Sequence, residues 1–260
     1  MSCSPFARVI GIDYSGAATA DDPLPGLRVY LADNNAPPHE VRPMPNQRRH
    51  WTRRALAHWL VAQLSDGLPT LVGIDHAFSF PLAYFQAHGL PLRWHVFLED
   101  FCAHWLTDAP GVRVDDVRRG RVGNGTARQG DARWRRLTDQ RTGAKSVFHF
   151  DVTGSVAKST HAGLPWLRFV RVQLGARVHV WPFDGWHVPS GVSALAEVYP
   201  SLWRDQFPSE GRTPDQHDAF VVAARLWQAM HSGELCAWLA PPRDPQVRAL
   251  AALEGWILGA

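Results

Sequence analysis

Two short apolar stretches of the chain end in an aspartate. The stretch IGIDYSG (residues 10–16) places Asp13 after apolar residues, and VGIDHAF (residues 72–78) places Asp75 in the same position. A buried carboxylate without a partner is among the least favourable groups in a fold. A divalent cation between two such carboxylates would turn their repulsion, roughly 4 kcal/mol at 4 Å and an effective dielectric of 20, into attraction. The pair therefore indicates a ligand site, whereas either aspartate alone is typical of a residue that caps the following turn.

The segments that carry these aspartates are predicted to be neighbouring parallel strands. Residues 8–13 and 70–75 are apolar without alternation, as in strands buried on both faces. An amphipathic helix, predicted at residues 48–64, connects them, so both strands should run in the same direction. Asp13 and Asp75 would then lie at one edge of the sheet, which is where open α/β sheets bind ligands.

The rest of the chain completes an α/β pattern. Further strands are predicted at residues 27–32, antiparallel to the first, and at 40–42, 177–181 and 194–199. Helices are predicted at residues 92–106, 154–174, 213–231 and 245–258. The second is expected to be helical only in part, because Gly163 and Pro165 interrupt it. The third opens with a capping box at Thr213. We expect one domain, residues 1–260, with an inserted helical and basic-loop region at about residues 81–176.

Three more acidic residues occupy positions that could belong to the same site. Glu197 lies within the apolar strand ALAEVY, where the alternative is a charge on a solvated strand face. Asp215 and Asp218 are three residues apart at the start of a predicted helix and therefore share one of its faces. Asp215 alone is also explained by the helix dipole, which favours acids in the first turn. Asp218 lies where the helix becomes apolar and is harder to explain without a site.

Composition limits the class of protein and the surroundings in which it works. The chain has 260 residues, 45% of them hydrophobic, and a net charge of +3, as expected of a globular protein. Its three cysteines, Cys3, Cys102 and Cys236, fit no disulfide or metal spacing, which predicts a reducing compartment and a cytoplasmic location. We expect no membrane span, because no apolar stretch approaches roughly 18 residues, and no signal peptide.

The middle of the chain carries a concentrated positive charge. Residues 112–146 contain ten basic and four acidic residues, 10 − 4 = +6, among several glycines, so we expect a flexible cationic loop. Such a patch is typical of nucleic-acid binding, and Trp134 could stack on a base. The alternative is a solvated loop whose arginines pair with nearby acids. The predicted contacts to nucleic acid, which include a lysine beyond the loop, are Arg128, Arg133, Trp134, Arg135, Arg136, Arg141, Lys145 and Lys158.

The order of these acidic positions resembles the layout of the ribonuclease H-like superfamily. More closely, the chain resembles the domain-of-unknown-function 429 family, whose members are described as predicted nucleases of that fold. The segments that carry the resemblance are GIDYSG, VGIDHAFSFP, QRTGAKS, TGSVAKSTHAGLPWLR, AEVYPS and DQHDAF. It implies an α/β fold with a mixed sheet flanked by helices and a helical, arginine-rich insertion after the fourth strand.

The resemblance also implies a metal-dependent nuclease. Its two Mg²⁺ or Mn²⁺ ions would be held by Asp13, Asp75, Glu197 and Asp218, with Asp215 as an additional ligand, and these carboxylates would be the catalytic residues. Asp75 departs from the superfamily pattern, because better-studied members usually have a glutamate at or near this position. Nucleic acid is the expected partner, and a homodimer is one expected oligomeric state. Two alternatives stay open: a nucleic-acid-binding module with little catalysis, and an actin-like or sugar-kinase-type phosphotransferase, which normally needs a longer chain.

Overall fold

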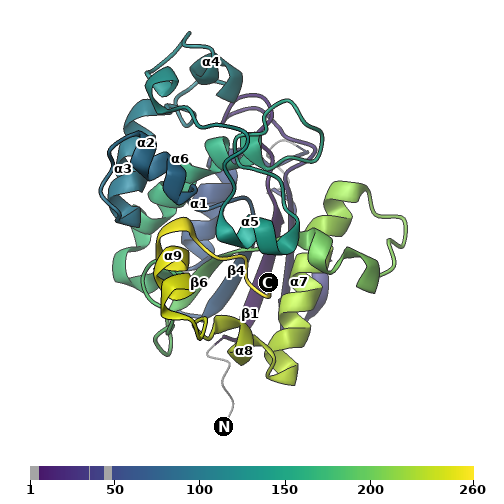
Figure 1. Ribbon diagram of the computed structural model, residues 1–260. Helices are drawn as coiled ribbons and strands as arrows, with labels where there is room; N and C mark the ends of the chain where they lie inside the picture. Colours follow the sequence, from purple (N-terminus) through teal and green to yellow (C-terminus); the bar gives the residue numbers. More distant parts are fainter. Residues whose placement is uncertain (1–5, 35, 44–48) are drawn as a thin grey trace.

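The computed structural model describes residues 6–34, 36–43 and 49–260 and contains one mixed six-stranded sheet (Figure 1). The strand order is β3-β2-β1-β4-β6-β5. β2 is antiparallel to β1 and β3, whereas β1, β4, β6 and β5 run parallel. The strands are β1 (Arg8–Asp13), β2 (Arg28–Asp33), β3 (Ala36–Glu40), β4 (Thr70–Asp75), β5 (Val178–Val180) and β6 (Ser193–Glu197). The prediction of parallel, neighbouring strands that end in Asp13 and Asp75 is therefore confirmed.

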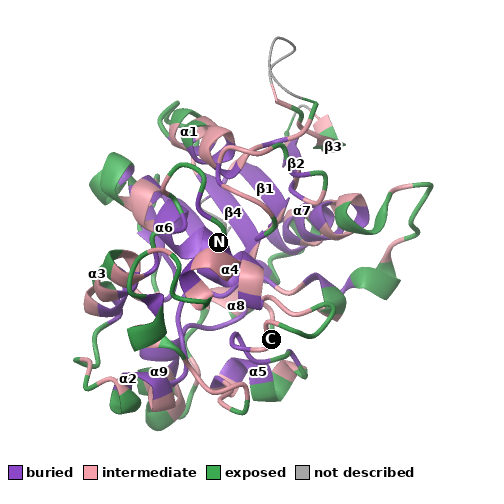
Figure 2. Cartoon of the chain, turned by 90° about the horizontal axis from the view of Figure 1, so that it is seen from above, coloured by how far each residue is buried: buried purple, intermediate pink, exposed green. Residues whose placement is uncertain are grey.

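Helices cover both faces of this sheet (Figure 2). The helices are α1 (Arg53–Gln63), α2 (Leu82–Ala87), α3 (Trp94–His104), α4 (Val114–Arg118), α5 (Leu137–Thr142), α6 (Ala157–Leu174), α7 (Pro214–Ser232), α8 (Leu235–Leu239) and α9 (Pro245–Glu254). Short 3-10 turns lie at Gly125–Arg128, Gly175–Arg177, Pro200–Leu202 and Arg204–Gln206. The buried strands lie between α1 and α6 on one side and α7 on the other.

Alternation along the central strands divides the buried side chains between two cores. Ile12 and Ile74 point into the core beneath α1 and α6. Gly11 and Gly73 point to the opposite face, where α7 packs. A Cβ atom on Gly11 would lie only 2.5 Å from the carbonyl oxygen of Ala219, so only glycine allows this close approach of α7. The repeated GID sequence thus combines a flat surface for a helix with a carboxylate on the same side.

Helix α6 is continuous through the two residues that were expected to interrupt it. That expectation is wrong, because a side chain from another segment compensates for each residue. Gly163 lies against His76, and a Cβ atom there would be 2.4 Å from His76 Nε2, so the glycine serves close packing. Pro165 has no N–H to offer the carbonyl of His161, but Thr107 Oγ1 donates a hydrogen bond to that oxygen at 2.7 Å. A side chain from another segment therefore replaces the missing helical bond.

Other elements match the predictions with shifted ends. Helix α7 begins after the expected Thr213 capping box and ends at Ser232, where the following Gly233 adopts a left-handed conformation. Helix α1 begins at Arg53, later than expected, and Arg48 lies outside the described residues. Helix α9 ends at Glu254, before the expected residue 258. The short helices α2, α4, α5 and α8 were not predicted, and three of them fall in the region expected to be an insertion.

Two expectations drawn from composition concern membrane spans and disulfides. In the described part of the chain, no helix is long and apolar enough to cross a membrane. Cys236 is disulfide-bonded, so the expectation that the cysteines form no disulfide is wrong, and the argument for a reducing compartment loses its support. Cys102 is a free, half-buried thiol.

Candidate functional site

Asp13 and Asp75 lie side by side at the carboxyl ends of β1 and β4. They are direct partners in the parallel register, two residues beyond the Gly11 and Gly73 pair. Because side chains alternate along a strand, both carboxylates point to the α7 face. Neither forms a hydrogen bond or ion pair with another described residue, and both are partly buried.

The start of α7 brings more acidic residues to this edge. The helix packs against the glycine surface, so its first turns lie next to the strand ends. Asp215 Oδ2 and Ser15 Oγ lie 3.5 and 3.6 Å from the position that a Cβ atom would take on Gly26. The loop after β1 and the first turn of α7 therefore meet near Gly26. Asp218, one turn further along α7, is held by Arg204 in a two-pronged ion pair with N–O distances of 2.7 and 2.5 Å.

The aspartates disfavour one another's ionisation. Burial raises the pKa of Asp13 well above its usual value, and the charges of Asp75, Asp215 and Asp218 add to this effect. Burial likewise raises the pKa of Asp75 to about 8, with contributions from Asp218 and Glu197. Arg204 is a positive group that opposes both shifts. A cation that binds here would therefore stabilise charge that the fold by itself disfavours.

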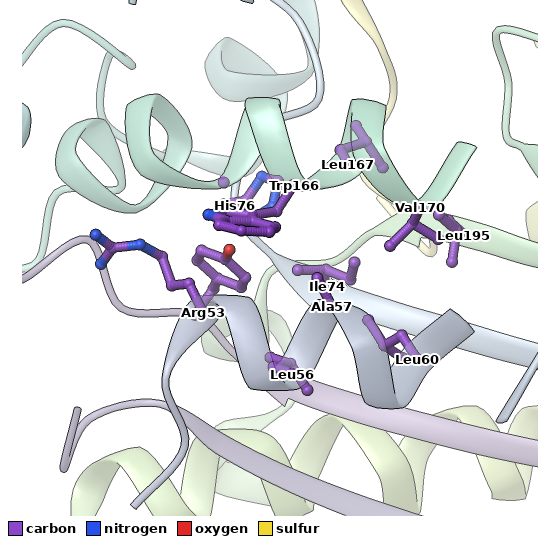
Figure 3. Close-up of a pocket in the computed structure, with 12 residues that line it drawn as sticks. Arg53, Leu56, Ala57, Leu60, Ile74, His76, Trp166, Leu167, Val170 and Leu195 are labelled. Atoms are coloured by element: carbon purple, nitrogen blue, oxygen red, sulfur yellow. The ribbon is translucent and has the colours of Figure 1, made fainter. Parts of the chain in front are cut away.

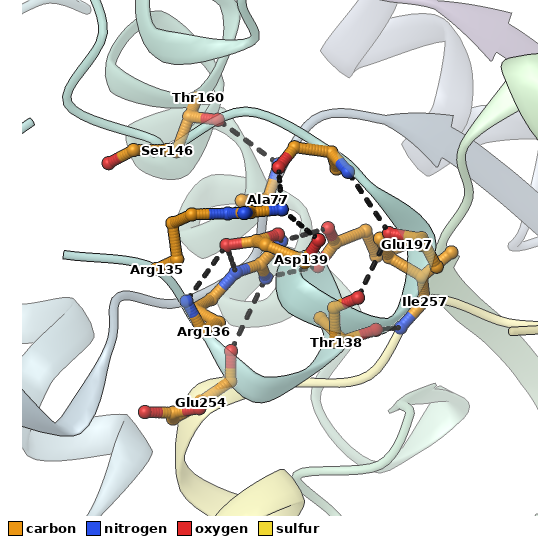
Figure 4. Close-up of polar contacts among 12 residues, drawn as sticks. Ala77, Arg135, Arg136, Thr138, Asp139, Ser146, Thr160, Glu197, Glu254 and Ile257 are labelled. Carbon is orange, nitrogen blue, oxygen red and sulfur yellow. Dashed lines mark hydrogen bonds and ion pairs between the residues drawn. The ribbon is translucent and has the colours of Figure 1, made fainter. Parts of the chain in front are cut away.

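Glu197 belongs to a different network (Figure 4). Its two carboxylate oxygens accept hydrogen bonds from Arg136 at 2.5 and 2.6 Å. Arg136 also donates to both oxygens of Asp139, and the side chains of all three residues are at most 5% exposed. Glu197 also accepts a hydrogen bond from the backbone N–H of Phe78. Its register partner is Ile74, so it points to the sheet face opposite Asp13 and Asp75.

The same network fixes the helices that follow the strand ends. The Glu254 carboxylate accepts hydrogen bonds from the backbone N–H groups of Leu82 and Leu137, at the starts of α2 and α5. Arg136 donates to the Glu254 carbonyl. Burial raises the pKa of Glu197, although Arg136 opposes the shift. The network therefore joins β6, α5 and α9 beside the candidate site and leaves Glu197 no free oxygen for a ligand.

The structure places most of the predicted nucleic-acid contacts in internal ion pairs and hydrogen bonds. Arg136 is 1% exposed and cannot reach a ligand in this conformation. Two of the others form ion pairs, Arg128 with Asp100 and Lys158 with Asp115. Two more donate hydrogen bonds to backbone carbonyls, Arg135 to Asp139 and Ala144, and Lys145 to Thr153. Trp134 is partly buried against Phe148. The exposed members are Arg133, with its side chain 88% exposed beside Asp131, Arg141, stacked on Trp256, and Lys145.

The residues that follow the two aspartates, Tyr14 and His76, are aromatic and pack on the other side of the sheet. Tyr14 and His76 contact each other edge to face, with ring centroids 4.7 Å apart. They line a small apolar cavity of about 20 Å³ between α1 and α6 (Figure 3). The Tyr14 hydroxyl, Arg53 Nε and Trp166 Nε1 have no hydrogen-bond partner among the described residues.

Of the four carboxylates expected to hold two cations, Asp13 and Asp75 have oxygens without a hydrogen-bond partner in the described part of the chain, whereas Glu197 and Asp218 are held by arginines. Among residues 6–34, 36–43 and 49–260, no three His, Cys, Asp or Glu side chains are arranged to hold a metal ion. Glu197 and Asp218 are occupied by Arg136 and Arg204. Asp13 and Asp75 remain, and Mg²⁺ is commonly bound by one or two carboxylates together with water and phosphate oxygens.

Two features of this site had weak signals in the sequence. Arg204 lies fourteen residues before its partner Asp218, and no spacing rule connects a turn residue to a helix at that distance. The Arg136–Asp139 pair has helical (i, i+3) spacing, which could have indicated an internal ion pair.

Comparison of the chain with protein-family models, with curated proteins and with solved structures finds no match.

Proposed function

We propose that the chain is a Mg²⁺- or Mn²⁺-dependent nuclease with a ribonuclease H-like fold, and that Asp13 and Asp75 hold its cation. The observation that carries the proposal is the in-register carboxylate pair, which has no counter-charge in direct contact among the described residues. Carboxylate oxygens are the ligands that Mg²⁺ and Mn²⁺ prefer. The position at the carboxyl ends of parallel strands also supports a ligand site.

The chain's own residues would divide the remaining work. A bound cation supplies Lewis-acid chemistry for phosphodiester hydrolysis, polarising a phosphoryl oxygen and making water more acidic. Arg204, with its side chain 48% exposed, is well placed to contact a phosphate because, among the residues that the structure describes, only Asp218 holds its guanidinium. The side chain of Asp218 keeps Arg204 beside the two central aspartates. Asp215 is exposed and borders the site from the first turn of α7.

Nucleic acid is the proposed substrate, and exposed arginines near the site support it. Arg133 and Arg141 are exposed in the segment that leads into and through α5. In Figure 1, α5 lies near the sheet end where Arg136 contacts Glu197. Since the other basic residues of this segment are held in internal contacts, binding would depend on a few arginines and on Arg204.

The test compares cleavage and binding by the wild type, Asp13→Asn and Asp75→Asn. Single-stranded, duplex and branched DNA and RNA would be incubated with Mg²⁺ or Mn²⁺. Each substitution removes a charge with little change in volume, so we expect cleavage to fall by several orders of magnitude while folding is retained. Asp108→Asn, at an exposed residue outside the cluster, is the matched control. Cleavage that is equal in all four proteins would contradict the proposal, and binding without cleavage by the wild type would favour a binding module.

A further inference from the structure

A second pocket, of about 240 Å³, lies where the start of α3, the second half of α6 and helix α9 meet the turn after β5. Its lining includes none of the carboxylates of the candidate site. Part of the lining is apolar and open to solvent. Leu92 is 61% exposed and Phe183 is half-buried. Ala249 and Ala252 are exposed residues of α9. A ligand in this pocket can therefore contact apolar surface directly.

Arg171, on α6, brings a positive charge with a fixed position to this pocket. Its Nη1 donates a hydrogen bond to Asp184 at 2.5 Å, and its guanidinium lies over the Trp94 ring, 5.4 Å from the centroid. Both supports are themselves held. Asp184 accepts a hydrogen bond from the backbone N–H of Val180 at 2.7 Å. Trp94 Nε1 donates to the Phe78 carbonyl at 2.8 Å. Because the guanidinium is already positioned, little side-chain freedom would be lost when it binds a ligand.

One edge of the Arg171 guanidinium is available for binding. Its Nε and Nη2 have no hydrogen-bond partner among the described residues, and the side chain is 32% exposed. These two N–H groups lie on one side of the planar guanidinium, where their spacing matches the two oxygens of a carboxylate. The free edge therefore favours a two-pronged contact with an anion.

The charges that line the pocket favour a ligand with one negative charge. Arg171 and Arg93 are positive and Asp184 is negative, which leaves a net charge of +1 when His95 is neutral. Arg93 is exposed and forms no ion pair within the described part of the chain. The Asp184 side chain is 22% exposed, so it would repel a phosphate monoester, with its charge of about −1.5 to −2, more strongly than a carboxylate.

We propose that this pocket binds a small organic carboxylate with an apolar body. The carboxylate accepts hydrogen bonds from Nε and Nη2 of Arg171, and the apolar body packs on Leu92 and Phe183. The volume is below the roughly 300–1,000 Å³ of sites for drug-sized molecules, which suits a smaller molecule such as 3-phenylpropionate. The inference does not rest on the nuclease proposal, because it requires neither a cation nor the pair of Asp13 and Asp75.

The experiment measures binding by calorimetry in a chelating buffer at pH 7.5, which keeps it separate from any cation-dependent activity. The probes are 3-phenylpropionate, 4-methylpentanoate, acetate, 3-phenylpropanamide and phenyl phosphate. We expect the first two to bind with dissociation constants of about 1 mM or lower. Acetate lacks the apolar body and the amide lacks the charge, so each should bind about tenfold more weakly or worse. Phenyl phosphate should bind more weakly than 3-phenylpropionate, and tighter binding of the phosphate would contradict the choice of a carboxylate.

Substitutions test the guanidinium and the apolar surface separately. Arg171→Met keeps much of the stem but removes the guanidinium, so 3-phenylpropionate should lose about tenfold in affinity while the weaker binding of the amide stays unchanged. Arg168→Met is the matched control, because Arg168 lies one turn earlier on α6, pairs with Glu99 and does not line the pocket. Ala252→Trp should fill the pocket and abolish binding, and Ala249→Trp serves if that variant does not fold.

If Arg171→Met does not fold, Arg171→Lys takes its place. Lysine keeps the charge but cannot form the two-pronged contact, so 3-phenylpropionate should again bind more weakly than to the wild type. The proposal is overturned if neither apolar carboxylate binds, or if 3-phenylpropionate binds no better than its amide. It is also overturned if the folded Arg171 variant, or the variant with a filled pocket, retains the wild-type affinity.

Discussion

Replacing Arg136 with methionine should be among the most destabilising single changes in this chain. All three nitrogens of its guanidinium donate hydrogen bonds, to Glu197, Asp139 and the Glu254 carbonyl, and the residue is 1% exposed. Methionine fills much of the same space but leaves two carboxylates buried without a counter-charge. Removing one partner of a buried ion pair costs about 3–5 kcal/mol, which is a large share of the stability of a typical domain.

The pH dependence of this loss follows from the carboxylates that remain. Burial already raises the pKa of Glu197 in the wild type, and Arg136 opposes that shift. Without the arginine the pKa of Glu197 should rise further, so the variant gains stability, relative to the wild type, as pH falls and the carboxyl group is protonated. The difference in unfolding free energy between Arg136→Met and wild type should therefore be smaller at pH 5 than at pH 8.

Urea denaturation at both pH values measures this difference. Arg133→Met is the matched control, because its side chain is 88% exposed and it should change nothing measurable. If Arg136→Met does not fold, the triple variant with Glu197→Gln and Asp139→Asn should recover folding, because no buried charge remains in the ion pairs. Equal stability of the Arg136→Met and Arg133→Met proteins, or a loss that does not vary with pH, would refute this account of the network.

Three further outcomes are expected. In a chelating buffer, Asp75→Asn should be more stable than wild type by about 1–3 kcal/mol at pH 8 and by less at pH 5. The reason is that the folded-state pKa of Asp75 is about 8, so wild-type stability is lost as pH rises toward 8. Urea denaturation midpoints at the two pH values would show whether this sign holds. Gly11→Ala should lower the unfolding free energy by about 1–3 kcal/mol, because the added Cβ atom would meet the backbone of α7. Gly26→Ala is the control and should be nearly neutral, because the nearest atom to its Cβ position is 3.5 Å away. Equal melting temperatures of the two variants would argue against the close packing of α7 on Gly11. Thr107→Val should lower the unfolding free energy by about 1 kcal/mol, because the His161 carbonyl loses its hydrogen-bond donor. An unchanged unfolding free energy would mean that α6 tolerates Pro165 without the hydrogen bond from Thr107.

The sequence predicted the sheet well where local pattern determines structure. The unbroken apolar runs before Asp13 and Asp75 indicated buried parallel strands, and the Thr213 capping box located the start of α7. Helix α6 shows where such rules fail. Gly163 and Pro165 disfavour a helix locally, but the partners that make them acceptable, His76 and Thr107, come from distant parts of the chain.

The candidate site was predictable only in part, for the same reason. The shared edge of Asp13 and Asp75 followed from strand direction alone. The partner of Glu197 is Arg136, which lies 61 residues earlier in a segment expected to be a flexible loop. Charge counting could not distinguish arginines that face solvent from those that hold internal carboxylates. Of the two explanations for the basic segment, internal pairing describes most of its residues.

The most direct test of the central claim is Mn²⁺ binding, measured by electron paramagnetic resonance, to the wild type, Asp13→Asn, Asp75→Asn and Asp108→Asn at pH 7.5. We predict one bound Mn²⁺ per wild-type chain, the same for Asp108→Asn, and at least a tenfold loss of affinity for each of the other two variants. Unchanged Mn²⁺ binding in Asp13→Asn and Asp75→Asn, or no bound Mn²⁺ in the wild type, would contradict the claim that these two aspartates hold a catalytic cation.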